Sequence, residues 1–208
     1  MLTNEQVGKN REEYLSLVNS INRQFDKDRM VKWLDRGSDF FIAPASTKYH
    51  GAYEGGLCEH SLNVYHTLVK LIETTKALKP ELPDFDEDTI KVVALFHDLS
   101  KANFYEKYWR NVKDPTTGKW EQVQEYRVRD NRFVFGNHEQ TAEYIARSLI
   151  PLSQEESVAI LHHMGGISFD CTKTDLSEVF AAYPLAALLH SADLISCYVL
   201  EEDHAENN

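Results

Sequence analysis

VVALFHDLSK, residues 92–101, is the stretch on which the interpretation of the whole chain depends. A histidine and an aspartate, His97 and Asp98, stand side by side at the end of an apolar run that we expect to be buried. An ionised carboxylate buried without a partner costs several kcal/mol. Asp98 therefore needs a neighbouring positive charge or a bound cation.

Further histidines and a second aspartate lie on other apolar segments. Helical spacing of i, i+3, i+4 and i+7 places each of them on a face that should point into a core. A single inward histidine is more often an ordinary core residue than a ligand. Four such histidines and two inward aspartates are difficult to satisfy separately, and one shared metal centre would satisfy them together. The predicted ligands are His60, His97, Asp98, His138, His163 and Asp193.

This ligand set contains imidazole and carboxylate but no thiolate. It suits iron, manganese, zinc or nickel, with magnesium possible, and does not select among them. Six ligands exceed what one open catalytic ion needs, so we expect two divalent ions with Asp98 as the bridge. Two ions about 3.5–4 Å apart would lower the pKa of a water between them toward ~7 and so supply a hydroxide nucleophile.

The remaining sequence predicts a mostly helical chain. Periodicity and capping residues indicate one all-α domain over 1–208, with a core of about 45–200 and N-terminal helices within 3–36. Tyr, Trp and Val on both sides of Asp114-Pro115-Thr116-Thr117-Gly118 predict an inserted β-hairpin over 104–128. We expect loops over 37–56 and 164–182 and a frayed tail from Glu201 to Asn208. The expected helices cover 3–21, 25–36, 56–77, 86–97, 138–149, 153–163 and 183–200.

Composition limits the partners. The chain has 208 residues, 42% of them hydrophobic, which suffices for one sizeable core. Its formal net charge of -11 argues against a surface for duplex DNA but allows a nucleotide in a metal-lined pocket. Three scattered cysteines, no apolar signal core and no membrane-length apolar run predict reduced thiols, no membrane partner and a cytoplasmic location. The oligomeric state stays open.

The His60, His97-Asp98 and Asp193 pattern resembles the HD superfamily of metal-dependent phosphohydrolases over about residues 45–200. The segment YHGAYEGGLCEHSL, residues 49–62, is similar to HD-type 3'-5' exoribonucleases. His138 in GNHE and His163 in HMGG look like the second-metal ligands of the dinuclear branch, which includes diadenosine tetraphosphate hydrolases. His162 adjoins His163, and the likeness favours His163.

The resemblance implies a helical bundle around the metals and hydrolysis of a phosphate ester or anhydride. It also implies that Lys101 faces the phosphate, although a solvated lysine at a helix end is an equal alternative. His50, in the loop before the metal helix, and Arg132, in a small basic cluster, are further candidates for binding substrate. Ser100 stands where the family usually has glycine, a change that we expect to be harmless. The aromatic residues of the hairpin could stack on a base, but they are also typical of any strand.

We therefore expect a dinuclear phosphohydrolase acting on a nucleotide or a short oligonucleotide. Asp98 and Lys101 would carry the catalysis. One rival is a mononuclear nucleotide phosphatase, which would need only His60, His97, Asp98 and Asp193. Another is a non-catalytic module that binds nucleotide and regulates a partner. The number of bound ions, and turnover itself, separate the three.

Overall fold

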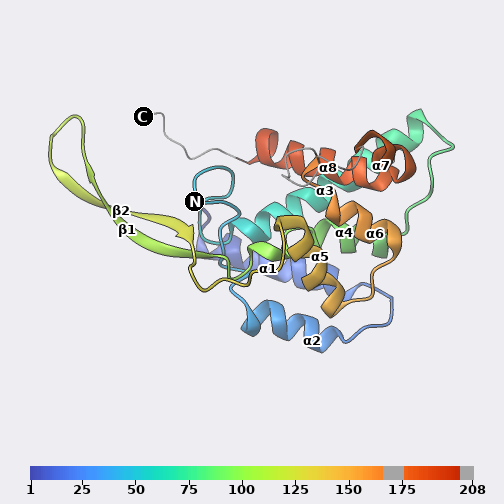
Figure 1. Ribbon diagram of the computed structural model, residues 1–208, viewed down its shortest axis with the longest axis horizontal. Helices are drawn as coiled ribbons and strands as arrows, with labels where there is room; N and C mark the ends of the chain where they lie inside the picture. Colours follow the sequence, from blue (N-terminus) through green and yellow to red (C-terminus); the bar gives the residue numbers. More distant parts are fainter. Residues whose placement is uncertain (166–175, 202–208) are drawn as a thin grey trace.

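Figure 1 shows the computed structural model of the chain, a bundle of helices from which a two-stranded hairpin projects. The structure describes residues 1–165 and 176–201. Over these residues the elements follow in the order α1 (Asn4–Asn19), α2 (Lys27–Lys32), α3 (Gly56–Leu78), α4 (Glu87–Phe96), β1 (Tyr105–Lys113), β2 (Trp120–Val128), α5 (His138–Leu149), α6 (Gln154–Leu161), α7 (Leu176–Ala182) and α8 (Pro184–Ile195).

Helices α3 and α4 form the centre of the bundle. Helix α3 packs against α1, α4 and α8, while α6 packs against α4 and α8. Every residue from Val92 to Phe96 is fully buried. A helix that is apolar on all sides must be surrounded by others, so α4 delivers the His-Asp pair at its end into the interior.

Tight backbone packing fixes where α3 begins. Gly55 has φ +84°, a left-handed conformation that suits glycine. A side chain at Gly56 would place its Cβ 2.1 Å from the carbonyl oxygen of Gly51. The Leu57 N–H also donates to the Ala43 carbonyl at 3.0 Å. The loop is thus held against the helix start and sets the position of the first turn of α3.

The predicted hairpin is confirmed. Strands β1 and β2 pair antiparallel, from Tyr105 opposite Val128 to Lys113 opposite Trp120. In the turn, the Asp114 carboxylate accepts hydrogen bonds from the backbone N–H groups of Thr116 and Thr117, at 2.7 and 2.8 Å. The tip points away from the helices (Figure 1), and the Trp120 side chain there is 70% exposed.

The helix expected over 25–36 is found over residues 27–37, but its second half is not α-helical. Helix α2 ends at Lys32, and a wider π-helical turn follows over Trp33–Gly37. The Ser38 hydroxyl donates to the Leu34 carbonyl at 3.2 Å. This bond satisfies one of the carbonyls left free at the end of the helical segment.

The C-terminal part also departs from expectation. The helix expected over 183–200 is α-helical as α8 to Ile195 and continues as a π-helical turn, Ser196–Leu200. Where the geometry changes, the Ser196 hydroxyl donates to the Ala192 carbonyl at 2.8 Å, and so does the Ser196 backbone N–H. Part of the loop expected over 164–182 is helix α7, because Phe180 packs against the core.

No described helix is by itself long and apolar enough to cross a membrane. Only Leu176–Ala182 taken together with Pro184–Leu200, across a bend of 111°, reaches that length and composition. Of the cysteines predicted to be reduced, Cys58 and Cys197 are free thiols, and Cys171 lies outside the described residues.

Candidate metal centre

The His-Asp pair occupies the point where α4 ends. His97 is the C-cap of α4, and Asp98 has φ -111° and ψ 18°, outside the helical region. A short 3-10 turn, Leu99–Lys101, follows. The chain therefore changes direction at Asp98, and its side chain, 2% exposed, points into the bundle rather than along the helix.

The two carboxylate oxygens of Asp98 face two different pairs of histidines. Oδ1 lies 2.6 Å from Nε2 of His138 and 3.5 Å from Nε2 of His163. Oδ2 lies 3.4 Å from Nε2 of His60 and 3.6 Å from Nε2 of His97. Four imidazoles thus present the same ring nitrogen to one carboxylate.

The sixth predicted ligand, Asp193, lies beside the pair that faces Asp98 Oδ2. Asp193, on α8, places its Oδ1 3.2 Å from Nε2 of His60. The Cys197 thiol, one helical turn later, donates to that same oxygen at 3.3 Å. The structure therefore brings together all six residues predicted as ligands, although they come from five separate segments.

Two of the imidazoles are oriented by their own helices. Nδ1 of His97 donates to the Ala94 carbonyl at 2.8 Å, and Nδ1 of His163 donates to the Ile160 carbonyl at 2.7 Å. These bonds use carbonyls left free at the ends of α4 and α6. They place the proton on Nδ1 and leave the Nε2 lone pair directed at Asp98, the arrangement that metal-binding histidines commonly have.

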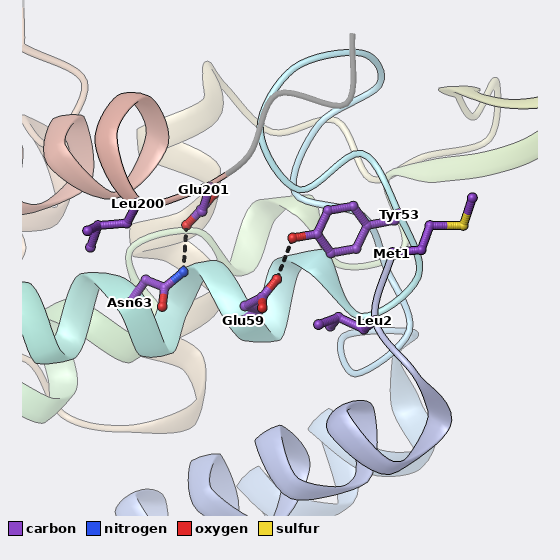
Figure 2. Close-up of a pocket in the computed structure, with 7 residues that line it drawn as sticks. All are labelled: Met1, Leu2, Tyr53, Glu59, Asn63, Leu200 and Glu201. Carbon is purple, nitrogen blue, oxygen red and sulfur yellow. Dashed lines mark hydrogen bonds between the residues drawn. The ribbon is translucent and has the colours of Figure 1, made fainter. Parts of the chain in front are cut away.

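His60 is oriented by a residue that the sequence did not reveal. Its Nδ1 lies 2.9 Å from Oε1 of Glu201, which also accepts from the Asn63 amide at 3.1 Å (Figure 2). The prediction of a frayed tail is therefore wrong at Glu201, which is 9% exposed; residues 202–208 lie outside the described part. Nothing in the spacing of this acidic tail distinguished Glu201 from its neighbours.

His138 depends on the residue that departs from the family pattern. Its Nδ1 lies 2.7 Å from the hydroxyl of Ser100. A glycine at position 100 could not make this contact. Ser100 therefore orients His138 as Glu201 orients His60, and the departure from glycine supplies a bond that we had not expected.

Two histidines close to these ligands, His162 and His190, contact backbone carbonyls instead. Nδ1 of His162 donates to the Val158 carbonyl at 2.8 Å, and this ring does not face Asp98. Nδ1 of His190 donates to the His163 carbonyl at 2.6 Å. Of the adjacent pair, His163 is the one that points at the carboxylate.

Burial and charge shift the ionisation of these groups in opposite directions. Burial disfavours the imidazolium of His60, but Glu201 and Asp193 outweigh it and raise the pKa of His60 to about 10. Burial lowers the pKa of His97 to about 3. Burial opposes ionisation of Asp98, yet Lys101 and the surrounding histidines hold its pKa well below the usual range. The cluster thus combines ionised carboxylate with a neutral imidazole ligand.

The donor set fits divalent metal ions. His60, His97 and Asp193 can direct one ligand atom each to a common point, and so can His97, Asp98 and His163. Among the described residues, three buried atoms have no hydrogen-bond partner: His163 Nε2, Glu201 Oε2 and Asp98 Oδ2, the last of which has the Lys101 ammonium 2.6 Å away. Buried polar atoms are normally satisfied, and a cation bound between His163 and Asp98 would satisfy the Nε2 lone pair of His163. Mixed imidazole and carboxylate suits a transition metal.

Lys101 is not a solvated lysine. Its side chain is 15% exposed, and Nζ lies 2.6 Å from Asp98 Oδ2 in an ion pair. Of the two roles that the sequence left open, a solvated lysine at a helix end therefore does not fit, while contact with phosphate stays a prediction. Burial opposes the ammonium charge, but Asp98 outweighs it and raises the pKa of Lys101.

The other two predicted substrate-binding residues lie at the edge of the cluster. The ring centroid of His50 is 5.1 Å from that of His60, and its Nε2 lies 3.4 Å from the Cys197 thiol. Arg132 lies farther out, on a cavity of about 160 Å³ that Ser100 and His138 also line. The His138 side chain, 28% exposed, is the most accessible of the metal-facing imidazoles. The centre is therefore reached from the His138 side.

Fold and site together define a helical domain with a candidate metal centre built on a buried His-Asp pair. The chain belongs to the HD domain family, whose model matches residues 57–183. This match contains His60, the His-Asp pair, His138 and His163, while Asp193 lies beyond its end. No curated protein and no solved structure matches the chain. Membership places the protein in a superfamily of metal-dependent phosphohydrolases, and the likeness to exoribonucleases and diadenosine tetraphosphate hydrolases stays a prediction.

Proposed function

We propose that the protein is a dinuclear phosphohydrolase that cleaves a phosphate ester or anhydride of a nucleotide or a short oligonucleotide. The observation that carries the proposal is the carboxylate of Asp98, whose two oxygens face two separate pairs of imidazole nitrogens. A carboxylate presented in this way is suited to bridge two ions. A single ion bound at one carboxylate oxygen would leave the pair of imidazoles at the other oxygen without a metal ion to coordinate.

The ligands divide between the two ions as follows. Asp98 Oδ2, His60, His97 and Asp193 would hold one ion, and Asp98 Oδ1, His138 and His163 would hold the other. Two bound divalent ions supply a water of lowered pKa as nucleophile and stabilise the attacking and leaving oxygens of phosphoryl transfer.

Lys101 would act on the substrate rather than on the metal ligands alone. Its ammonium is kept protonated by Asp98 and lies 2.6 Å from Oδ2 of that carboxylate. A preorganised cation there would stabilise the negative charge that develops on the phosphoryl oxygens. His50 and Arg132 flank the centre from different segments and would hold the remaining phosphate or sugar groups.

The local charge supports a small anionic substrate. Within the predicted basic cluster, Arg127 pairs with Glu106 at 2.7 Å and Arg129 pairs with Asp39 at 2.6 Å. Arg132 makes no ion pair with any residue in the described part of the chain, so its charge is available for phosphate. One free arginine beside a metal centre, in a chain of net charge -11, suits a nucleotide better than a duplex.

The decisive experiment is elemental analysis of the protein purified without chelators or metal-binding tags. We expect about two transition-metal ions per chain, and about one in His138→Ala. His162→Ala is the matched control, because it removes a neighbouring imidazole that faces away from Asp98. One ion in all three proteins would support a mononuclear phosphatase instead. Failure of every metal-loaded form to hydrolyse simple phosphodiesters would leave a binding module.

A further inference from the structure

Three aromatic side chains gather on the surface beside the entrance to the metal centre. Phe133 and Phe135 precede α5, and Tyr144 lies on it. The rings of Phe135 and Tyr144 stack at 4.3 Å between centroids, and Phe133 lies 5.8 Å from Tyr144 with its ring inclined by 25°. We call these three residues the aromatic platform.

The platform is exposed to a degree that core packing does not explain. Phe133 and Phe135 are each 55% exposed and Tyr144 is 45% exposed. Single exposed apolar residues are normal, but adjacent ones that form a patch commonly mark a binding site. Phe135 and Tyr144 form the closest pair and support Phe133, whose ring is left with a free face.

The platform is continuous with the candidate centre. Phe133 lines the same cavity of about 160 Å³ as Ser100 and His138. Arg132, the next residue along the chain, also lines it and places its guanidinium 5.6 Å from the ring centroid of Phe104. The cavity therefore runs from an imidazole of the centre, past a free cation, to an exposed aromatic ring.

We propose that the aromatic platform binds the nucleobase of the substrate, which stacks on Phe133 while Arg132 contacts a phosphate. This inference rests on the proposed function and deepens it, because it identifies the substrate as a nucleoside phosphate. Bases stack on aromatic rings with little sequence preference, so the platform would select for the presence of a base rather than for its identity. Trp120, at the far end of the hairpin, does not line this cavity.

The test compares two chromogenic diesters that share a leaving group. Thymidine 5'-(p-nitrophenyl) phosphate carries a base, and methyl p-nitrophenyl phosphate does not. In Phe133→Ala we expect kcat/KM for the thymidine ester to fall about tenfold, mainly through KM, since stacking on one ring commonly contributes that much. The methyl ester should be turned over within twofold of the wild-type rate. Phe133→Trp should retain the preference for the thymidine ester.

The matched control is Trp120→Ala, which removes an exposed aromatic ring at the tip of the hairpin and should leave both esters unchanged. Equal loss on both esters in Phe133→Ala, no loss on either, or the same selective loss in Trp120→Ala would overturn the inference. A dimer that Phe133→Ala converts to monomer in sedimentation would likewise assign the platform to a second copy of the chain.

Failure of the proposed function would be seen separately. If the wild-type protein hydrolyses neither ester with any metal, the platform is tested by equilibrium binding of thymidine 5'-monophosphate and ribose 5-phosphate. A tenfold weaker affinity of Phe133→Ala for the nucleotide alone would support the platform without catalysis. Equal affinity of both proteins for both ligands would overturn it.

Discussion

Replacing Glu201 by glutamine should change how protons and metal compete for His60. In the wild-type protein the carboxylate of Glu201, with Asp193, raises the pKa of His60 to about 10. The imidazole is therefore protonated at neutral pH before metal binds, and that proton must leave for Nε2 to coordinate an ion. Apparent metal affinity should accordingly rise with pH up to about 10. Glu201→Gln keeps the side-chain shape but removes the charge.

The magnitude follows from the buried contact of 2.9 Å between His60 and Glu201. A hydrogen bond to a charged group contributes roughly 1.5–3 kcal/mol, which corresponds to about 1–2 units of pKa. The pKa of His60 should fall by that amount. At pH 9, metal binding should then displace about 0.9 of a proton from His60 in the wild type but less than about 0.5 in the variant. In the variant, His60 is a weaker metal ligand, but it also holds its proton less tightly. Near pH 7 these two effects offset each other, so the wild type and the variant should have similar affinities for the metal.

Titration calorimetry with Zn²⁺ in two buffers of different protonation enthalpy measures the protons released. Glu59→Gln is the control, because it makes the same change of charge one residue from His60, where the carboxylate binds the Tyr53 hydroxyl at 2.5 Å instead (Figure 2). It should release as many protons as the wild type. The reasoning is refuted if Glu201→Gln also releases as many as the wild type at pH 9.

Three further outcomes are expected. Ser100→Ala should weaken the second ion about 10-fold with little effect on the first, as loss of a ligand-orienting bond commonly does; metal titration followed by elemental analysis measures both. Arg23→Ala should lower the free energy of unfolding, measured by urea titration, by about 3 kcal/mol, because it removes the ion-pair partner of the fully buried Glu156. Arg11→Ala, which removes a more exposed ion pair, should lower it by less than about 1 kcal/mol. A chelator should lower the melting temperature and remove one ion faster than the other, and loss of both ions at one rate would contradict the two-site division.

The fold was predictable wherever the signal was local. The apolar run ending at His97, the capping residues before α1 and α4 and the turn around Asp114 all depend on neighbours in sequence, and the structure follows them. The change from α to π geometry after Lys32 and after Ile195 was not predictable in this way. Apolar spacing marks where a helix lies, but it does not distinguish an α-helical turn from a wider π-helical one.

In the candidate site, too, some residues could be recognised from their neighbours in sequence and others could not. The inward residues are recognisable because a histidine on an apolar face conflicts with its surroundings. Glu201 lies in an acidic tail, where a carboxylate is unremarkable, and it reaches His60 across 141 positions of sequence. Ser100 was visible only as a departure from a family pattern. Residues that orient a metal ligand are harder to recognise in the sequence than the ligand itself. Many polar side chains could make the orienting hydrogen bond, and tertiary packing decides which one does.

The way in which the imidazoles are held suggests how two ions could differ within one cluster. His97 and His163 are fixed by carbonyls of their own helices, so their orientation follows whenever those helices form. His60 and His138 are fixed by side chains from elsewhere, Glu201 in one case and Ser100 in the other. Each proposed ion would thus have one locally fixed imidazole and one that depends on tertiary structure. A carboxylate holds the buried imidazole, and a neutral hydroxyl holds the one that is 28% exposed. The stronger acceptor would therefore support the proposed enclosed ion, and the weaker one would support the proposed ion beside the cavity, where exchange with substrate would take place.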